Sequence, residues 1–185
     1  MPPKVKITKE EIINTAVEIV RKDGAQAINA RTIAALLNCS TQPVFSNFDT
    51  MGKLQEAVII AAYDRYCDFL KNEVESGRYP QYKAFGMAYV RFAKEERELF
   101  KLLFMRDRTG EDLSPTPDFE EAVQMIMKAN GITIEQATRM HLEVWACVHG
   151  IGVMVATSFL PLKWEMISDM LTDVYQGLRK QYGME

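Results

Sequence analysis

Residues 29–48 read NARTIAALLNCSTQPVFSNF, and this stretch decides the fold that the sequence predicts. Asn29 is a good helix cap, and the apolar residues after it favour a helix of about two turns. Asn38 tolerates the left-handed conformation that would end this helix. Ser40 is a second candidate cap, and Pro43 costs little in a first helical turn because its missing amide would have no partner there. The stretch therefore predicts two short helices joined by a tight turn, a helix-turn-helix unit.

The residues before this unit predict a longer helix over about 9–23 that braces it from behind. Thr8 and Glu11 have the spacing of a capping box, an apolar stripe follows them, and Gly24 stands where a left-handed residue can end the helix. Helical periodicity continues to the end of the chain without the sustained alternation that a half-buried strand requires, so the chain is predicted to be all-α. The further helices are expected at about 53–75, 82–93, 94–105, 118–129, 134–159 and 163–182, the fifth of them capped by Thr133 with Gln136. We expect a helix-turn-helix domain over residues 1–52 and a helical bundle over residues 53–185.

The composition is that of an ordinary globular protein. The 185 residues are 48% hydrophobic and 25% charged, which excludes collagen-like, low-complexity and largely disordered chains. Three cysteines in isolated positions argue against a disulfide framework or a structural zinc site, and the N-terminus lacks the apolar run of a secretory signal. We therefore expect a cytoplasmic protein.

One uncharged stretch, residues 144–162, is about as long as a membrane span. It contains His149 and Pro161, and the helical pattern around it continues amphipathically on both sides. We interpret it as a buried helix and expect no membrane association. A contact between subunits is one place where such a helix could be buried.

The net charge of −3 is unevenly distributed. Residues 1–48 carry a net charge of +2 and residues 49–185 a net charge of −5. Because affinity for phosphates grows with the number of charges neutralised, an excess of +2 is a weak signature of nucleic-acid binding. The prediction of nucleic-acid binding therefore depends on the helix-turn-helix motif and not on charge.

Over residues 12–54 the sequence resembles the TetR family of one-component bacterial transcription regulators. The resemblance follows the family's order of helix alanine, glycine, polar cap, Ile-Ala pair, serine, two aromatic residues and leucine. The matching residues are Ala16, Gly24, Asn29, Ile33, Ala34, Ser40, Phe45, Phe48 and Leu54. Further along, Trp145, His149 and Gly150 resemble a signature in the C-terminal domain of one subgroup of the family.

Three positions depart from the family pattern. The usual turn glycine is Asn38, which can adopt the same conformation. The usual tyrosine, whose hydroxyl reaches a phosphate, is Phe45, so that hydrogen bond is lost. A common phosphate-binding lysine is Met51, and Lys53 could replace it only if its helix starts late.

The candidates for DNA contact are short polar side chains and a few cations. A helix-turn-helix unit places its second helix in the major groove, where glutamine and asparagine can pair with adenine. The base-contacting candidates are Thr41, Gln42, Ser46 and Asn47, and the phosphate-contacting candidates are Asn29, Arg31, Thr32, Ser40 and Lys53. The alternative is an ordinary surface, with Asn29 and Ser40 acting as caps. Lys4, Lys6 and Lys9 suit either a basic arm or a solvated tail.

The second half of the chain is rich in aromatic and methionine residues, which suit a pocket for a small, largely apolar ligand. The ligand-binding candidates are Tyr89, Phe92, Phe100, Phe104, Met125, Trp145 and His149. A plain hydrophobic core is the alternative for each of them. His141 and His149 are eight residues apart, unlike a helical metal pair, so we expect no metal and no cofactor.

The last two helices are too apolar for one small bundle, and pairing with a twofold mate would bury the excess. The resemblance implies the same arrangement, a homodimer through these helices. We expect a ligand-responsive transcriptional regulator, a repressor, that acts as a homodimer on a palindromic DNA operator. The alternative is a helical small-molecule sensor or interaction module with weak or lost DNA binding. No nucleophile–base pair, phosphate loop or metal spacing suggests an enzyme.

Overall fold

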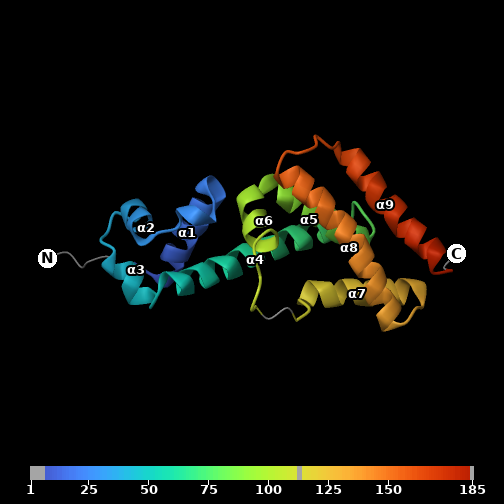
Figure 1. The fold of residues 1–185 in the computed structure, drawn as a ribbon, viewed down its shortest axis with the longest axis horizontal. Helices are drawn as coiled ribbons and strands as arrows, with labels where there is room; N and C mark the ends of the chain where they lie inside the picture. Colours follow the sequence, from blue (N-terminus) through green and yellow to red (C-terminus); the bar gives the residue numbers. More distant parts are fainter. Residues whose placement is uncertain (1–6, 112–113, 184–185) are drawn as a thin grey trace. The chain divides into compact units, whose positions relative to one another are not determined.

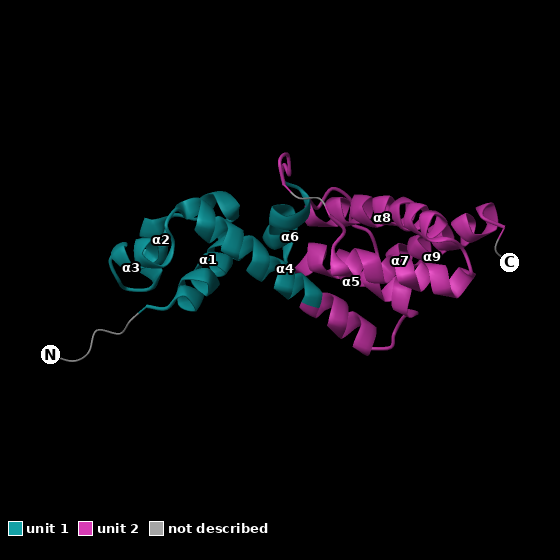
Figure 2. Cartoon of the chain, turned by 90° about the horizontal axis from the view of Figure 1, so that it is seen from below, with its two compact units in different colours: residues 1–67, 96–106 teal, residues 68–95, 107–185 magenta. Residues whose placement is uncertain are grey.

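The structure, a computed structural model, describes residues 7–111 and 114–183, and within these residues the regular secondary structure is entirely helical (Figure 1). The described part of the chain divides into two compact units (Figure 2). Of the described residues, unit 1 comprises residues 7–67 and 96–106, and unit 2 comprises residues 68–95, 107–111 and 114–183. The predicted all-α class, with a helix-turn-helix head and a C-terminal bundle, is confirmed.

Unit 1 holds the N-terminal helices and one helix from further along the chain. Its elements are α1 (Lys9–Asp23), the 3₁₀ turn η1 (Ala25–Ala27), α2 (Ala30–Leu36), α3 (Gln42–Asn47), the first part of α4 (Met51–Glu75) and α6 (Arg97–Phe104). The predicted capping box of α1 is present, because the Glu11 amide donates to the Thr8 hydroxyl and the Thr8 amide donates to the Glu11 carboxylate. α6 packs against α1, so unit 1 is more than the three helices that the N-terminal sequence predicts.

The helix-turn-helix segment keeps the predicted order with one change of cap. The Asn29 side chain accepts a hydrogen bond from the Thr32 amide at 2.9 Å, and Asn38 has a φ of 50°, both as predicted. The prediction that Ser40 caps α3 is wrong, because the N-cap is Thr41. Counted from Ser40, the third helical residue would be Pro43, which has no amide to donate to a capping side chain.

Two predicted helix starts also move. α4 begins at Met51 rather than at residue 53, and the Thr50 hydroxyl accepts from the Lys53 amide at 3.2 Å. The late start that would let Lys53 replace the family's lysine therefore does not occur. α6 begins at Arg97 rather than at residue 94.

Gly24 has the positive φ that was predicted, at 85°, but its ψ of 166° is extended and leads into η1, which the sequence did not predict.

Unit 2 is a helical bundle built from the end of α4 with α5 (Gln81–Glu95), α7 (Pro117–Asn130), α8 (Ile134–Ala156) and α9 (Trp164–Gln181). α5, α7 and α9 all contact α8, and α5 also contacts α7 and α9. Gly86 allows a close approach of α5 to α8 and α9, because a Cβ there would lie 3.0 Å from Leu171 Cδ1 and 3.3 Å from Val148 Cγ2. The predicted capping box of Thr133 and Gln136 is confirmed.

α8 covers much of the uncharged stretch 144–162 and ends at Ala156, three residues before the predicted end. Ser158, with a φ of 55°, leaves the helical conformation. Among the described residues no helix is long and apolar enough to cross a membrane. The domain boundary at residues 52 and 53 stays a prediction, and α4 runs through it without a break.

Candidate functional site

α3 presents two contrasting faces. Val44 and Phe48, four residues apart, are 1% and 4% exposed and anchor the helix to unit 1. Gln42, Phe45 and Ser46 are exposed. Since residues three and four apart share a helix face, the buried pair turns the other three toward solvent. The candidate interface is therefore an outward surface with two polar side chains and one aromatic ring.

The remaining polar candidates near α3 have local roles. Asn47 Nδ2 donates to the Pro43 carbonyl at 2.8 Å, so this amide is occupied within its own helix. The Asn29 amide caps α2 and also donates to the Ala27 carbonyl at 3.1 Å. Thr32 and Thr41 are half-buried and Ser40 is exposed. Of the amides predicted to reach DNA, Gln42 is the one on the exposed face of α3.

The candidate cations differ in their surroundings. Arg31 is exposed on α2. Lys53 Nζ lies 2.8 Å from Glu56 Oε2, and this hydrogen bond and charge raise the pKa of Lys53. The pair is exposed, so it is weak and a phosphate could displace it. Lys9 Nζ lies 5.1 Å from the centre of the Phe48 ring, whereas Lys4 and Lys6 lie outside the described residues.

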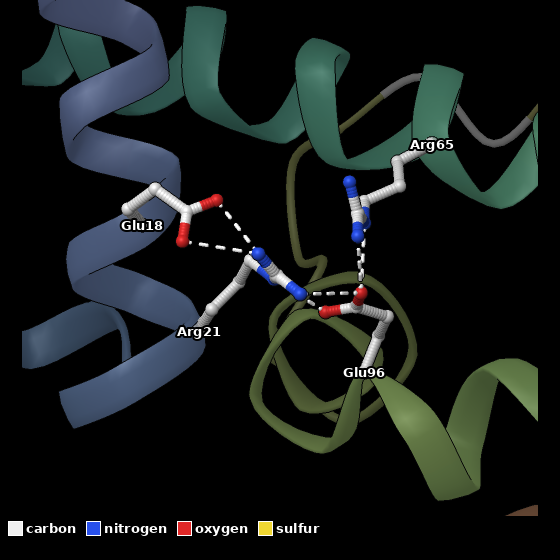
Figure 3. Close-up of polar contacts among 4 residues, drawn as sticks. All are labelled: Glu18, Arg21, Arg65 and Glu96. Carbon is white, nitrogen blue, oxygen red and sulfur yellow. Dashed lines mark hydrogen bonds and ion pairs between the residues drawn. The ribbon is translucent and has the colours of Figure 1, made fainter.

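A buried carboxylate holds unit 1 together at a point that sequence reasoning missed (Figure 3). Glu96, 5% exposed, accepts hydrogen bonds from Arg21 of α1 at 2.7 and 2.9 Å and from Arg65 of α4 at 2.6 and 2.8 Å. Arg21 also donates hydrogen bonds to Glu18. The hydrogen bonds to the two carboxylates raise the pKa of the Arg21 guanidinium, and Glu96 has the larger effect. Because Glu96 directly precedes α6, this cluster, the Glu96 clasp, ties α6 to both α1 and α4. Seventy-five residues separate Arg21 from Glu96, so no local pattern signals the contact.

Three of the ligand-binding candidates meet in unit 2, between α5 and α8. Tyr89 Oη lies 2.8 Å from His149 Nδ1, and the Trp145 ring stacks on the His149 ring at 4.9 Å between centroids. Tyr89 is buried and Trp145 is 39% exposed, so the trio leads from the core to the surface. Burial lowers the pKa of His149 and raises the pKa of Tyr89, which keeps both groups neutral at neutral pH.

The other ligand-binding candidates do not join this trio as one cluster. Phe92 is fully buried in unit 2 and packs edge-on against Phe69. Met125 is half-buried on α7. Phe100 and Phe104 belong to unit 1, where Phe104 packs against Phe100 and Tyr66.

A second tyrosine–histidine pair in unit 2 joins the half-buried Tyr82 to the buried His141. Tyr82 Oη is 2.9 Å from His141 Nδ1, and the Phe119 ring meets the His141 ring edge-on at 4.7 Å. Burial lowers the pKa of His141 to about 4, against a smaller opposing effect of Asp118, and raises the pKa of Tyr82. Tyr82 and Tyr89 are seven apart on α5 and the histidines are eight apart on α8, a repeat that could have suggested the pairing.

The family of the chain is shown by a match over its C-terminal helices. Residues 82–174, half of the chain, match the family model described as the tetracyclin repressor-like C-terminal domain. The chain belongs to the TetR family. This TetR-family protein is a transcriptional regulator by family, and the family is not one of enzymes.

This TetR-family chain is similar in sequence to one curated regulator and in fold to several solved structures. It is 23% identical over 160 residues to an uncharacterized HTH-type transcriptional regulator of Mycobacterium tuberculosis, covering 84% of this chain and 73% of that one. A protein of unknown function from Rhodococcus sp. RHA1 has a TM-score of 0.73 at 20% identity, covering 96% and 98% of the two chains. A TetR-like transcriptional regulator from the same organism has a TM-score of 0.63 at 14% identity over 99% of both chains. The multidrug binding protein EbrR, in complex with imidazole, has a TM-score of 0.57 at 16% identity, covering 89% and 93%.

Proposed function

We propose that this TetR-family protein is a ligand-responsive repressor that binds a palindromic DNA operator as a homodimer. The observation that carries the proposal is the outward face of α3, where Gln42 and Ser46 stand opposite the buried Val44 and Phe48. A glutamine in the major groove can pair with adenine through two hydrogen bonds. Thr41 and Asn47 flank this face. Arg31, Thr32, Ser40 and Asn29 are the proposed phosphate contacts, which would set the register of the helix without reading sequence.

Gln42→Ala tests the readout directly. We expect this variant to lose about 5- to 150-fold in affinity for the selected operator per half-site, the equivalent of about 1–3 kcal/mol, because one bidentate base contact disappears from each half-site. Binding to random DNA should hardly change, since phosphate contacts dominate it. Fluorescence anisotropy at a fixed salt concentration measures both affinities, with DNA fragments selected from a random library as the operator.

Gln55→Ala is the matched control, because Gln55 is also an exposed glutamine of unit 1 but lies on α4. It should bind like the unaltered protein. Equal losses on operator and random DNA in Gln42→Ala would contradict base readout. The second candidate, a small-molecule sensor without DNA function, is favoured by the occupied Asn47 amide and the Lys53–Glu56 pair. It predicts that the unaltered protein selects no sequence at all.

The homodimer is proposed from the outer faces of α8 and α9. Leu142 and Trp145 on α8 are 48% and 39% exposed, and Met166 on α9 is 52% exposed. Gly177 is exposed within α9, and a Cβ built there would meet nothing within 4 Å. A glycine inside a helix costs about 1 kcal/mol relative to alanine, so close approach of a second chain gives it a reason. A dimer would also present two α3 helices to half-sites about one helical turn apart.

Charges on this surface should separate the two chains. We expect the double substitution Leu142→Glu with Met166→Glu to halve the mass found by sedimentation velocity, because four carboxylates would be desolvated across a twofold interface. Ile60→Glu, at a residue of α4 that is 62% exposed, is the matched control and should leave the mass unchanged. A monomeric unaltered protein at micromolar concentration would contradict the proposed dimer.

The ligand site is proposed around Tyr89, Trp145 and His149, which contact one another in unit 2. The trio combines one aromatic surface with hydrogen-bonding groups that are neutral, which suits a small, largely apolar ligand. A ligand bound here would favour one arrangement of the helices over another and weaken DNA binding through α4, which runs from unit 1 into unit 2.

A further inference from the structure

The aromatic ring on the exposed face of α3 has no role in the hydrogen-bonding readout. Phe45 is 53% exposed, although the apolar residues before and after it, Val44 and Phe48, are buried. Leu36 and Ile60 are as exposed, so exposure by itself does not assign a role. Phe45 differs from them in position, because it follows Gln42 by three residues and precedes Ser46 on the same helix face.

The chemistry of the ring limits what it can contact on DNA. A phenylalanine ring has no hydroxyl, so it can bond neither to a phosphate nor to the hydrogen-bonding edge of a base. The major groove offers one apolar group at its base edges, the C5-methyl group of thymine, and a phenylalanine is among the side chains that contact it. A ring beside a glutamine on one helix face would therefore contact a methyl group next to the base that the glutamine reads.

We infer that Phe45 is a specificity-determining residue that recognises the C5-methyl group of one thymine in each half-site of the operator. This inference rests on the proposed DNA-binding function and adds a position-specific readout to it. The contact buries one methyl group against the ring, and at about 0.8 kcal/mol for a buried CH₂ group it corresponds to about a fourfold effect on affinity. The absence of the family's tyrosine hydroxyl at this position would then mean that a phosphate contact is replaced by a contact with a base.

The test removes the methyl group and nothing else from the DNA. Deoxyuridine has the hydrogen-bonding edge of thymidine without the C5-methyl group, so each thymine of the selected operator is replaced by it in turn. We expect one replacement per half-site to weaken binding by about fourfold, or by roughly 16-fold when both half-sites carry it. In Phe45→Ala the same replacement should change affinity by less than about 1.5-fold, because the contact is already absent.

Control variants make the result specific. Gln42→Ala should bind more weakly but retain the deoxyuridine penalty at the same position, and Phe45→Leu should retain part of it. Circular dichroism confirms that each variant is folded, which is expected because the ring is more than half exposed.

The contrary outcomes distinguish a failure of the Phe45 inference from a failure of the proposed function. A deoxyuridine penalty that is the same in Phe45→Ala and in the unaltered protein, a selected operator without thymine, or an effect of Phe45→Ala on oligomeric state alone would each overturn the Phe45 inference and leave the proposed function standing. If the unaltered protein selects no operator, the proposed function fails and the inference falls with it.

Discussion

Replacing Glu96 by alanine is expected to lower the free energy of unfolding of unit 1 by about 3 kcal/mol. The Glu96 carboxylate is 5% exposed and accepts hydrogen bonds from two guanidinium groups. Removing it takes this carboxylate from both Arg21 and Arg65, and Arg21 keeps its pair with Glu18. Their side chains are 32% and 40% exposed, so water compensates part of the loss, which places the effect at the lower end for a broken buried ion pair.

The spectroscopic probes can distinguish the two units in this experiment. Both tryptophans, Trp145 and Trp164, lie in unit 2, whereas circular dichroism reports the helices of both units. We expect Glu96→Ala to shift the urea midpoint seen by circular dichroism. The tryptophan fluorescence midpoint will shift with it only if the two units unfold together.

Glu18→Ala is the matched control for the Glu96 clasp. The Glu18 side chain is 63% exposed and also pairs with Arg21, so its removal should cost less than about 1 kcal/mol. Glu96→Gln keeps the shape of the side chain and one acceptor oxygen and should fall between the two. A loss below about 0.5 kcal/mol in Glu96→Ala would contradict a stabilising role for the clasp.

The second large effect concerns pH. The pKa of His141 is about 4 in the folded protein and about 6.5 in an unfolded chain, so between these values the unfolded chain takes up a proton that the folded one does not. The stabilising contribution of neutral His141 is therefore complete above pH 6.5 and is lost as the pH falls toward 4. Over that interval the free energy of unfolding should drop by about 3 kcal/mol on account of this residue.

The comparison with His141→Gln isolates this contribution from the carboxylates that titrate in the same range. The amide can still accept a hydrogen bond from Tyr82 but does not titrate, so the slope of stability against pH should be flatter between pH 6.5 and 4. The groups around the ring are Asp118 of α7, Tyr82 of α5 and Tyr175, which packs on Tyr82. NMR titration of the ring protons, with His149→Gln to assign the two histidines, measures the pKa directly. Equal slopes in the two proteins would show that His141 titrates normally.

Local contacts explain why much of the head could be predicted from sequence. The Thr8 and Thr133 capping boxes and the Asn29 cap each join residues three apart. Because the hydrogen-bonding partners are this close in the sequence, the sequence pattern alone predicts the contact. The buried face of α1 follows from helical periodicity in the same way. Where local reasoning failed, at Ser40, another local rule won, because Pro43 cannot donate the capping hydrogen bond.

The amino-acid sequence by itself determined that this chain is helical, that it resembles TetR-family regulators, and that polar residues lie on and beside the second short helix of a helix-turn-helix. Only the tertiary structure decided that Glu96 joins α6 to α1 and α4, and that Tyr82 and Tyr89 each reach a histidine of α8. Residues 31 to 75 positions apart meet only after the chain has closed long loops, and the burial that makes such contacts selective belongs to the packed helices. A sequence records which groups could pair, and packing selects the ones that do.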